Sequence, residues 1–285
     1  MLDVFEKYTS TKLSPEAPVP VIKLKNYQTS LGGAANVANN LAINNMDVTL
    51  IGQIGNDVEG QEIIKLCNEA DISTKFLITS ECQTIIKKRI LVDDQHLARV
   101  DREDNFKAKD VLSQLMKHDV NEKTIILISD YDKGFLNKKE IAKIISYAKK
   151  KSALITIDTK KSDLTCFRNS DIITPNMSEF KKIIEPNKVL NLPEQGRQIL
   201  KKYNIKSLLV TLSSEGLLYI DREFHLQSPA EIQQVHDITG AGDVVFAFWN
   251  MTYLYEKSIK KRLKICNEAA SISLTKLGTN PVKLL

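Results

Sequence analysis

The sequence predicts an α/β fold in which a mostly parallel central sheet is covered by helices on both faces. Short, β-branched apolar segments alternate with amphipathic helical segments along most of the chain. The apolar segments are almost continuously hydrophobic, which is typical of strands that are buried on both faces. The 285 residues, 42% of them hydrophobic, are enough to build one large core.

The predicted central elements follow one another in an alternating strand and helix order. Parallel neighbours need a crossover connection, usually a helix, so this order favours a parallel sheet. Strands are predicted at residues 47–54, 123–129, 153–158, 172–173 and 207–211, and helices at residues 58–70, 136–150, 193–203 and 244–254.

Two segments depart from this alternation, namely residues 19–24 and residues 85–100. Both have the composition of antiparallel strands with no helix between them. The prolines around the first segment lack an N–H donor and confine it to the edge of a sheet. We expect these segments to leave the main body together, as a small β-sheet lid formed by about residues 9–30 and 83–103.

The composition argues against several classes of function. The net charge is +5 and the lysines are scattered along helices, so no nucleic-acid partner is expected. No apolar run reaches the roughly 18 residues of a membrane span, and no secretory signal opens the chain. We therefore expect no membrane partner and a cytoplasmic location. The four cysteines lack metal-ligand spacing and are predicted to be reduced and structural: Cys67, Cys82, Cys166 and Cys266.

The strongest candidate site is the segment DITGAGD at residues 237–243, which precedes a long apolar helix. Its glycines allow a tight turn that points several backbone N–H groups at one spot, and the helix N-terminus adds partial positive charge there. Such a site stabilises an anion that gains charge in a transition state. Asp243 would repel a bound phosphate but is well placed to accept a proton from an attacking hydroxyl.

The alternative interpretation of Asp243 is a capping aspartate on a buried helix. Two other nucleotide-binding motifs are excluded by the spacing. The third glycine of a dinucleotide fingerprint would fall at Val245, and the lysine of a P-loop is missing.

A second candidate site opens with Gly32 and Gly33 and continues into a helix rich in alanine and asparagine. Small residues let a ligand approach the backbone closely, and Asn36 can donate and accept hydrogen bonds to sugar hydroxyls. The alternative is a tightly packed helix start.

A third candidate site is the segment TPNMSEF at residues 174–180. Asn176 and Glu179 lie one turn apart and could hold a hydrated Mg²⁺ beside nucleotide phosphates. The same pair also has the spacing of a capping box, which is a purely structural role.

The three motifs, in this order, resemble those of the ribokinase-like sugar kinases, the phosphofructokinase B group. A narrower resemblance extends over nearly the whole chain and is to the bacterial D-glycero-D-manno-heptose-7-phosphate kinases. It rests on the segment SPEAPVPV at residues 14–21, on Lys87 with Arg89 and Arg99 with Asp101, and on the segment KLGT at residues 276–279.

This resemblance implies a ribokinase-like three-layer α/β/α sandwich with a small β-sheet lid, as one kinase domain over residues 1–285. It implies ATP and Mg²⁺ as cofactors, and transfer of the γ-phosphoryl group to the anomeric hydroxyl of heptose 7-phosphate, in ADP-heptose biosynthesis. A homodimer formed through the lid is also implied. The alternatives are a kinase of another sugar or nucleoside, and an inactive relative that binds a sugar phosphate.

The resemblance also assigns roles to individual residues. Asp243 is the expected catalytic base, beside an anion hole made by the amides of Gly240, Ala241 and Gly242. The expected sugar ligands are Asp3, Gly32, Gly33 and Asn36, and the expected ligands of its distal phosphate are Lys87, Arg89, Arg99 and Lys133. The expected nucleotide ligands are Lys160, Asn176, Ser213, Gly216 and Asn267, with Asn176 and Glu179 near the metal.

One feature of the family has no counterpart in the sequence. Family members have an apolar strand directly before the segment that Met1 to Asp3 matches, and this strand lies inside the parallel sheet. Here Asp3 is almost the first residue. We expect an interior position of the sheet to lack its strand, unless a rearrangement, a partner chain or an upstream segment fills it, because unpaired backbone groups are unfavourable.

Overall fold

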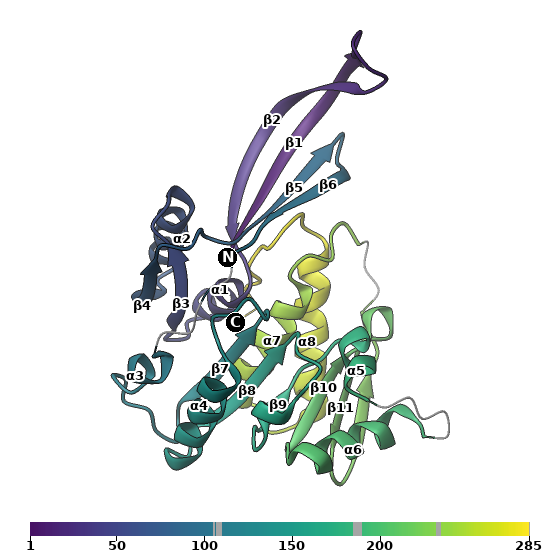
Figure 1. Cartoon of the computed structure of the whole chain (residues 1–285). Coiled ribbons are helices and arrows are strands. Elements are labelled where there is room, and N and C mark those ends of the chain that lie inside the picture. Colours follow the sequence, from purple (N-terminus) through teal and green to yellow (C-terminus); the bar gives the residue numbers. More distant parts are fainter. Residues whose placement is uncertain (105, 107–109, 185–189, 232–234, 285) are drawn as a thin grey trace.

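The strands in the described part of the chain form three separate sheets, with helices packed around them (Figure 1). The structure is a computed structural model that describes residues 1–104, 106, 110–184, 190–231 and 235–284. The largest sheet has the strand order β12-β11-β10-β9-β8-β7. Its strands are β7 (Ile125–Asp130), β8 (Leu154–Thr159), β9 (Ile172–Ile173), β10 (Ser207–Thr211), β11 (Leu217–Asp221) and β12 (His225–Ser228).

Strands β7 to β10 of the large sheet are parallel, and only β11 and β12 at one edge run antiparallel. This confirms the mostly parallel sheet that the sequence predicts. The predicted strands and helices of this region lie within a few residues of their observed bounds. The largest change concerns α7 (Ala241–Tyr253), which begins three residues before its predicted start because Gly240 is its N-cap.

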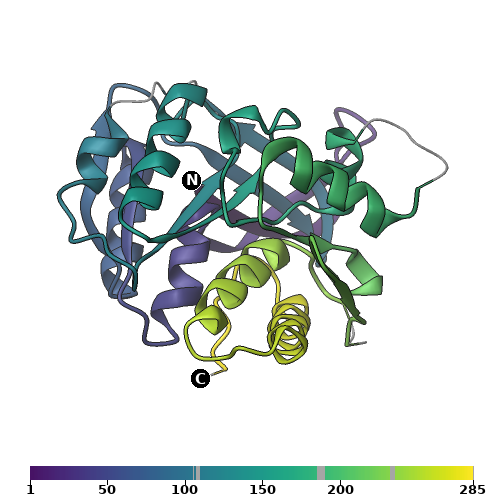
Figure 2. The same ribbon diagram turned by 90° about the horizontal axis from the view of Figure 1, so that it is seen from below.

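Helices cover both faces of the large sheet (Figure 2). One face is packed by α3 (Val111–Leu115), α4 (Lys138–Lys150), α5 (Met177–Ile183) and α6 (Leu192–Tyr203), and the other by α1 (Ala34–Ala42), α7 and α8 (Ile259–Leu274). Strand β10 shows why both faces of the sheet need a cover of helices. Leu208 and Val210 point into the first layer and Leu209 into the second, so that both faces of the strand are apolar.

A second, two-stranded sheet consists of the parallel strands β3 (Thr49–Gly55) and β4 (Ser73–Ser80). Helix α2 (Val58–Glu69) connects them, and the side chain of its N-cap Asp57 accepts a hydrogen bond from the Gly60 N–H. Ile54 of β3, Ile63 of α2 and Ile72, which directly precedes β4, are buried together with Leu2 in a third core cluster.

A third, four-stranded sheet has the order β2-β1-β5-β6, and its long hairpin projects from the body of the protein (Figure 1). Its strands are β1 (Leu2–Leu13), β2 (Pro20–Leu31), β5 (Ile86–Val92) and β6 (Gln95–Arg102). We call this sheet the lid sheet. It begins at Leu2, before the predicted position 9, because Leu2 and Val4 anchor β1 in the core. The proline-flanked strand β2 does lie at an edge.

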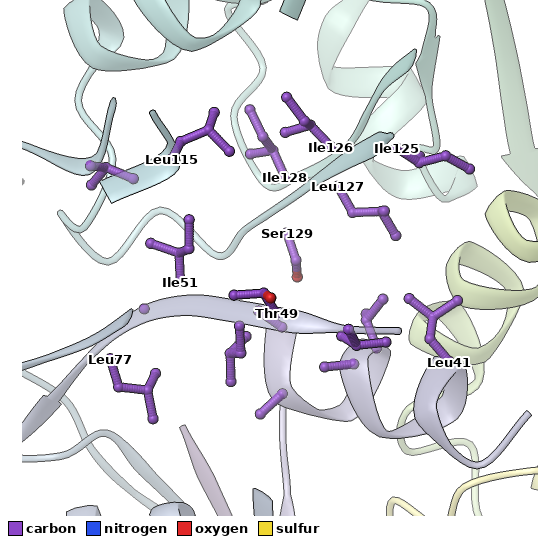
Figure 3. Close-up of a pocket in the computed structure, with 18 of the residues that line it drawn as sticks. Leu41, Thr49, Ile51, Leu77, Leu115, Ile125, Ile126, Leu127, Ile128 and Ser129 are labelled. Carbon is purple, nitrogen blue, oxygen red and sulfur yellow. The ribbon is translucent and has the colours of Figure 1, made fainter. Parts of the chain in front are cut away.

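The parallel layer is interrupted between β3 and β7. Strand β3 pairs with β4 and strand β7 with β8, and the structure gives neither of them a second partner among the described residues. A cleft of about 760 Å³ separates the two strands (Figure 3). The break expected from the sequence is therefore present, and it divides the central layer into sheets of six and two strands.

No helix among the described residues is long and apolar enough to cross a membrane. Within the part of the chain that the structure describes, no cysteine forms a disulfide, and Cys67, Cys166 and Cys266 are buried. Burial raises the pKa of the Cys67 thiol to about 11 and that of Cys266 to about 12, so both are neutral near pH 7.

Candidate active site

The N-terminus of α7 is shaped by the glycine-rich segment that precedes it. Gly240, the N-cap, has a φ of 80°, in the left-handed region that favours glycine. A Cβ at this position would lie 2.9 Å from Asn36 Nδ2. The Asp237 carboxylate accepts hydrogen bonds from the N–H and hydroxyl of Thr239 and from the Gly278 N–H. The loop is thus held in place by its own side chains and by the C-terminal segment.

The first residues of α7 leave room for a ligand. Gly242 is exposed, and a Cβ added there would meet no atom within 4 Å. The N–H groups of the first helical turn have no partner inside the helix, and the helix dipole makes this end partially positive. The backbone around Ala241 and Gly242 therefore offers an open site for an anion such as a phosphate group.

Asp243 lies in the same turn but is buried, with 5% of its surface exposed. Its two carboxylate oxygens are each held by one donor. The Tyr131 hydroxyl donates to Oδ1 over 2.9 Å and the Asn36 amide donates to Oδ2 over 2.9 Å. Burial raises the pKa of Asp243 to about 6, against the opposing effect of these two hydrogen bonds. Such a carboxylate is mostly ionised at neutral pH and can accept a proton.

The second predicted motif contacts the Asp243 site through Asn36. The Asn36 amide nitrogen is engaged by Asp243, and its amide oxygen accepts a hydrogen bond from Asn40 Nδ2 over 3.2 Å. Asn36 is 1% exposed and in this arrangement positions the Asp243 carboxylate. Gly33 caps α1 with a φ of 59°, and a Cβ on Gly32 would collide with the Asp3 carboxylate.

The four predicted phosphate ligands are mostly paired with carboxylates. Arg89 Nη1 lies 2.6 Å from Asp3 Oδ1, and both side chains are buried. The other two pairs are Arg99 with Asp101 at 2.8 Å and Lys133 with Glu103 at 2.5 Å.

Lys87 differs from these three because it makes no ion pair with any of the described residues. Its Nζ lies 5.1 Å from the centroid of the Tyr131 ring, next to Asp243. Burial lowers its pKa. Lys87, Arg89 and Arg99 share one face of the lid sheet, because Arg89 is opposite Arg99 and two residues from Lys87. Lys133 lies outside this sheet, on the loop after β7.

The third motif forms the capping box that was its structural alternative. The Asn176 side chain accepts a hydrogen bond from the Glu179 N–H, and Glu179 Oε2 accepts one from the Asn176 N–H, both over 2.9 Å. Glu179 Oε1 is also held by Lys160 Nζ, 2.5 Å away. Lys160 lies in turn 5.4 Å from the centre of the Tyr131 ring. The third motif and the Asp243 site are therefore neighbours.

Asp158, at the end of β8, is a candidate residue that the sequence reasoning did not single out. Its side chain is buried, and it accepts no hydrogen bond from the described part of the chain. Burial raises its pKa to about 7, Lys160 acts in the opposite direction, and Asp243, Glu179 and Asp130 raise it further. A cation near these acidic groups would favour the ionised form. The signal in the sequence was an aspartate at the carboxyl end of a predicted parallel strand.

Tyr131 is the second residue that sequence reasoning missed as a site residue. It follows β7 directly, and hence also lies at the carboxyl edge of the sheet, where the ligands of open α/β sheets bind. Burial and the nearby Asp243 charge raise its pKa well above the ordinary value, so the hydroxyl keeps its proton and acts as a donor.

The remaining predicted nucleotide residues gather around one short segment. Gly216 has a φ of 88°, and a Cβ there would collide with the backbone at Ser228. Asn267 donates from Nδ2 to the carbonyl oxygens of Ser228 and Pro229. Ser213 begins the 3₁₀ turn that ends before Gly216. These residues meet at the same edge of the sheet, beyond α7.

The comparison with protein families identifies the class of this protein. A model of the pfkB family carbohydrate kinases matches residues 5–284. The chain therefore belongs to this family, and it is an ATP-dependent sugar kinase.

Among curated proteins, the chain is similar to several that are named bifunctional protein HldE. The protein from Psychromonas ingrahamii is 32% identical over 290 residues, which is 100% of this chain. The protein from Haemophilus influenzae is 36% identical over 289 residues, or 99% of this chain. In both cases the match covers 60% of the relative, so the chain spans less than two thirds of the length of these proteins.

Solved structures show the ribokinase-like fold. Phosphofructokinase-2 from Escherichia coli in complex with fructose-6-phosphate superposes with a TM-score of 0.77 at 17% identity, over 97% of this chain and 92% of that one. Ribokinase from Arabidopsis thaliana, complexed with ribose and ATP, gives a TM-score of 0.75 at 20% identity, over 98% and 92% of the two chains. The predicted fold class is thereby confirmed.

Proposed function

We propose that this sugar kinase transfers the γ-phosphoryl group of ATP to the anomeric hydroxyl of D-glycero-D-manno-heptose 7-phosphate, a step of ADP-heptose biosynthesis. One observation carries the chemistry of this proposal. A buried carboxylate, Asp243, lies in the first turn of α7 beside the open backbone of Gly242. The choice of sugar is supported by the resemblance of the SPEAPVPV segment and the lid residues to the heptose-7-phosphate kinases.

In the proposed mechanism, Asp243 accepts the proton of the attacking sugar hydroxyl. The sugar oxygen forms a bond to the γ-phosphorus, the bond from that phosphorus to the bridging oxygen breaks, and ADP leaves. The backbone N–H groups of Gly240, Ala241 and Gly242 stabilise the charge on the transferring group. Tyr131 and Asn36 hold the carboxylate toward its substrate, and their hydrogen bonds keep the pKa of Asp243 low enough for it to act as a base near pH 7.

ATP is proposed to lie along the edge that runs from Lys160 to the turn at Gly216 and to Asn267. The residues present fit a divalent cation at the phosphates. Asp158 and Glu179 are both buried, and the negative charge of Glu179 raises the pKa of Asp158, an effect that a bound cation would offset. No cluster of three or more metal-ligating side chains is found among the described residues, so phosphate oxygens and water would complete the coordination. When bound, Mg²⁺ neutralises charge on the nucleotide phosphates. Asn176, engaged in its capping box, is assigned a positioning role for Glu179.

The distal phosphate of the sugar is assigned first to Lys87. Its ammonium group has no carboxylate partner among the described residues and points over Tyr131 toward the Asp243 site. Arg89 and Arg99 form ion pairs with Asp3 and Asp101. Each pair has no net charge, so these arginines would contribute hydrogen bonds to the phosphate but no additional positive charge. Lys133, which follows β7 and is paired with Glu103, is the weakest of the four candidates.

A turnover assay with a panel of acceptors tests the proposal. The chain is incubated with ATP, Mg²⁺ and heptose 7-phosphate, free heptose, fructose 6-phosphate, ribose or a nucleoside, and ADP release is measured. We expect heptose 7-phosphate to give the highest kcat/KM and free heptose to react far more slowly, since charge-assisted contacts to a phosphate are strong. Equal values for the two heptoses would exclude the phosphate-binding role of the lid. If only another acceptor is phosphorylated, that acceptor replaces heptose 7-phosphate as the assigned substrate. If no acceptor is phosphorylated, the result favours an inactive relative that binds a sugar phosphate.

A homodimer through the lid sheet belongs to the same proposal, as do the single kinase domain over residues 1–285 and a cytoplasmic location. The outer face of the lid sheet exposes Leu24, Tyr27 and Val100, with 57%, 54% and 53% of their surfaces accessible. An exposed apolar surface of this kind often marks a contact between proteins. Sedimentation velocity should show a dimer, and Tyr27→Glu should shift it to the monomer. A wild-type chain that sediments as a monomer at high micromolar concentration would exclude the dimer.

A further inference from the structure

Tyr131 lies on the loop after β7, between two aspartates. Asp130 is the last residue of β7 and is buried, with 7% of its surface exposed. Asp132 has a φ of 57°, in the left-handed region that residues other than glycine rarely adopt. Aspartate is one of the few residues that tolerate this conformation, and such a conformation persists where the surrounding contacts fix it. The position of Tyr131 therefore depends on the contacts of its two neighbours.

The side chain of Lys161 contacts both of these aspartates. Its Nζ lies 2.6 Å from Asp130 Oδ2 and 2.6 Å from Asp132 Oδ1, and only 12% of the lysine side chain is exposed. Burial disfavours the charged ammonium group, but the two carboxylates outweigh this effect and raise the pKa of Lys161. The lysine thus stays charged and joins the residues on either side of Tyr131. We call Asp130, Asp132 and Lys161 together the clamp.

The backbone at the ends of β7 and β8 connects the clamp to the sheet. Thr159, which is opposite Asp130 in the parallel ladder, accepts a hydrogen bond from the Lys161 N–H through its hydroxyl oxygen over 3.1 Å. The Lys160 N–H donates to the Asp130 carbonyl over 3.0 Å, and the Asp132 N–H donates to Asp130 Oδ1 over 3.0 Å. The loop that carries Tyr131 is thereby fixed to the end of β8.

Tyr131 connects the clamp to the Asp243 site. Its hydroxyl donates to Asp243 Oδ1 over 2.9 Å. A Cβ on Gly33 would lie 3.2 Å from Tyr131 Cε2, so the ring packs closely against the start of α1. The ammonium groups of Lys87 and Lys160 lie 5.1 and 5.4 Å from the centre of the ring. Because hydrogen bonds weaken steeply with poor geometry, a small shift of the loop would weaken the bond to Asp243.

We propose that Lys161 is a positioning residue of this kinase, which holds the Tyr131 hydroxyl on Asp243 by binding Asp130 and Asp132. The inference rests on the proposed role of Asp243 as the base of the reaction. Lys161 acts through Tyr131 and not through contact with the substrate. With the clamp intact, Asp243 keeps a donor that favours its ionised form, and without the clamp the carboxylate retains its proton to higher pH.

A charge-balanced pair of substitutions tests the proposal. Lys161→Met combined with Asp130→Asn removes one charge of each sign, so no buried carboxylate loses its partner and the net charge near Asp243 is unchanged. The matched control is Lys138→Met with Asp163→Asn, which removes an exposed pair whose Nζ and Oδ2 atoms are 2.5 Å apart. The titration of Asp243 is followed by NMR of carbon-13-labelled aspartate, and its signal is assigned by its absence in Asp243→Asn.

Other charged groups also act on Asp243, and every variant of this experiment retains them. They are the side chains of Asp3, Asp158 and Lys160 and the amino group of Met1. A change in the titration of Asp243 therefore reports on the clamp.

We expect the clamp variant to raise the pKa of Asp243 by at least about 0.5 unit, because its Tyr131 donor is loosened. The control pair should leave this pKa unchanged. In a Tyr131→Phe background, the clamp variant should cause no further rise, since the donor is already absent. A rise that persists in full in that background would overturn the proposal, because it would then come from a direct electrostatic effect.

Asp132→Asn provides a second variant in case the first does not fold. Asp132 has 55% of its side chain exposed, and asparagine also tolerates the left-handed conformation. Loss of its negative charge would by itself lower the pKa of Asp243, so a rise would identify the loss of positioning. If neither variant raises this pKa, the proposal is wrong.

The pH dependence of kcat/KM tests the proposed base separately. If Asp243 is the base, the acidic limb of the profile should follow the NMR titration in the wild type and in each variant. A wild-type limb that does not coincide with the titration would refute the base assignment. The role of Lys161 would still be decided, because the NMR measurement requires no turnover.

Discussion

Asp243→Asn separates the proposed catalytic role of this residue from its role in the fold. The asparagine has almost the same shape, and its amide can accept a hydrogen bond from Asn36 and donate one to the Tyr131 oxygen. The network is therefore preserved and the fold should not change. Loss of the proton acceptor should lower kcat by about 10²–10⁴, the usual contribution of a positioned base.

The same substitution should make the protein more stable at neutral pH. The pKa of Asp243 is about 6 in the folded protein and 3.8 in the reference state, a difference on the order of 3 kcal/mol at about 1.4 kcal/mol per pKa unit. Because the folded-state pKa is the higher one, the folded protein binds more protons than the unfolded chain between these values. Its stability therefore falls as pH rises from about 4 to 6, and the whole cost is present above pH 6. Asparagine carries no such cost.

Urea unfolding of both forms at several pH values measures this effect. At pH 8 the Asp243→Asn variant should be more stable by up to about 3 kcal/mol, and the difference should shrink steadily below pH 6 and vanish near pH 4. The activity of the same preparations gives kcat. Near-normal turnover would show that Asp243 is only a capping residue. A stability difference that does not depend on pH would show that its buried carboxylate is not the cause.

Further predictions concern the groups around Asp243. Tyr131→Phe removes a donor that lowers the pKa of Asp243, so the acidic limb of the kcat/KM profile should move up by about 1–2 pH units, equivalent to a charged hydrogen bond of about 1.5–3 kcal/mol. Gly242→Ala should stabilise α7 by about 0.5–1 kcal/mol, since a Cβ meets no atom within 4 Å. It should nevertheless lower kcat at least about tenfold, because the methyl group would occupy the proposed anion site. Lys87→Met should raise KM for the sugar phosphate about 10–100-fold with an unchanged KM for ATP, and an unchanged KM for the sugar would exclude its role. Asp158→Asn should raise the Mg²⁺ concentration for half-maximal activity at least about tenfold, whereas an unchanged Mg²⁺ titration would assign Asp158 a structural role.

The layer architecture was predictable because its signals are local. Continuous apolar runs such as residues 207–211 have only one stable environment, a strand covered on both faces. The place of the candidate site at the N-terminus of α7 was predictable for the same reason. Parallel strands end at one edge of their sheet, and a glycine-rich segment before an apolar helix places Asp243 at a helix N-terminus wherever that helix packs.

The sequence by itself therefore determined the fold class, the separate lid sheet and the helix N-terminus at which the proposed base, Asp243, lies. Only the tertiary structure decided which side-chain atoms meet. Asn36 holds Asp243, although they are 207 positions apart in the chain, and Arg89 is neutralised by Asp3. Such pairings depend on distances across packed elements, which no local pattern encodes. For the same reason, Tyr131 and Asp158 became site residues only when their strands were placed beside α7.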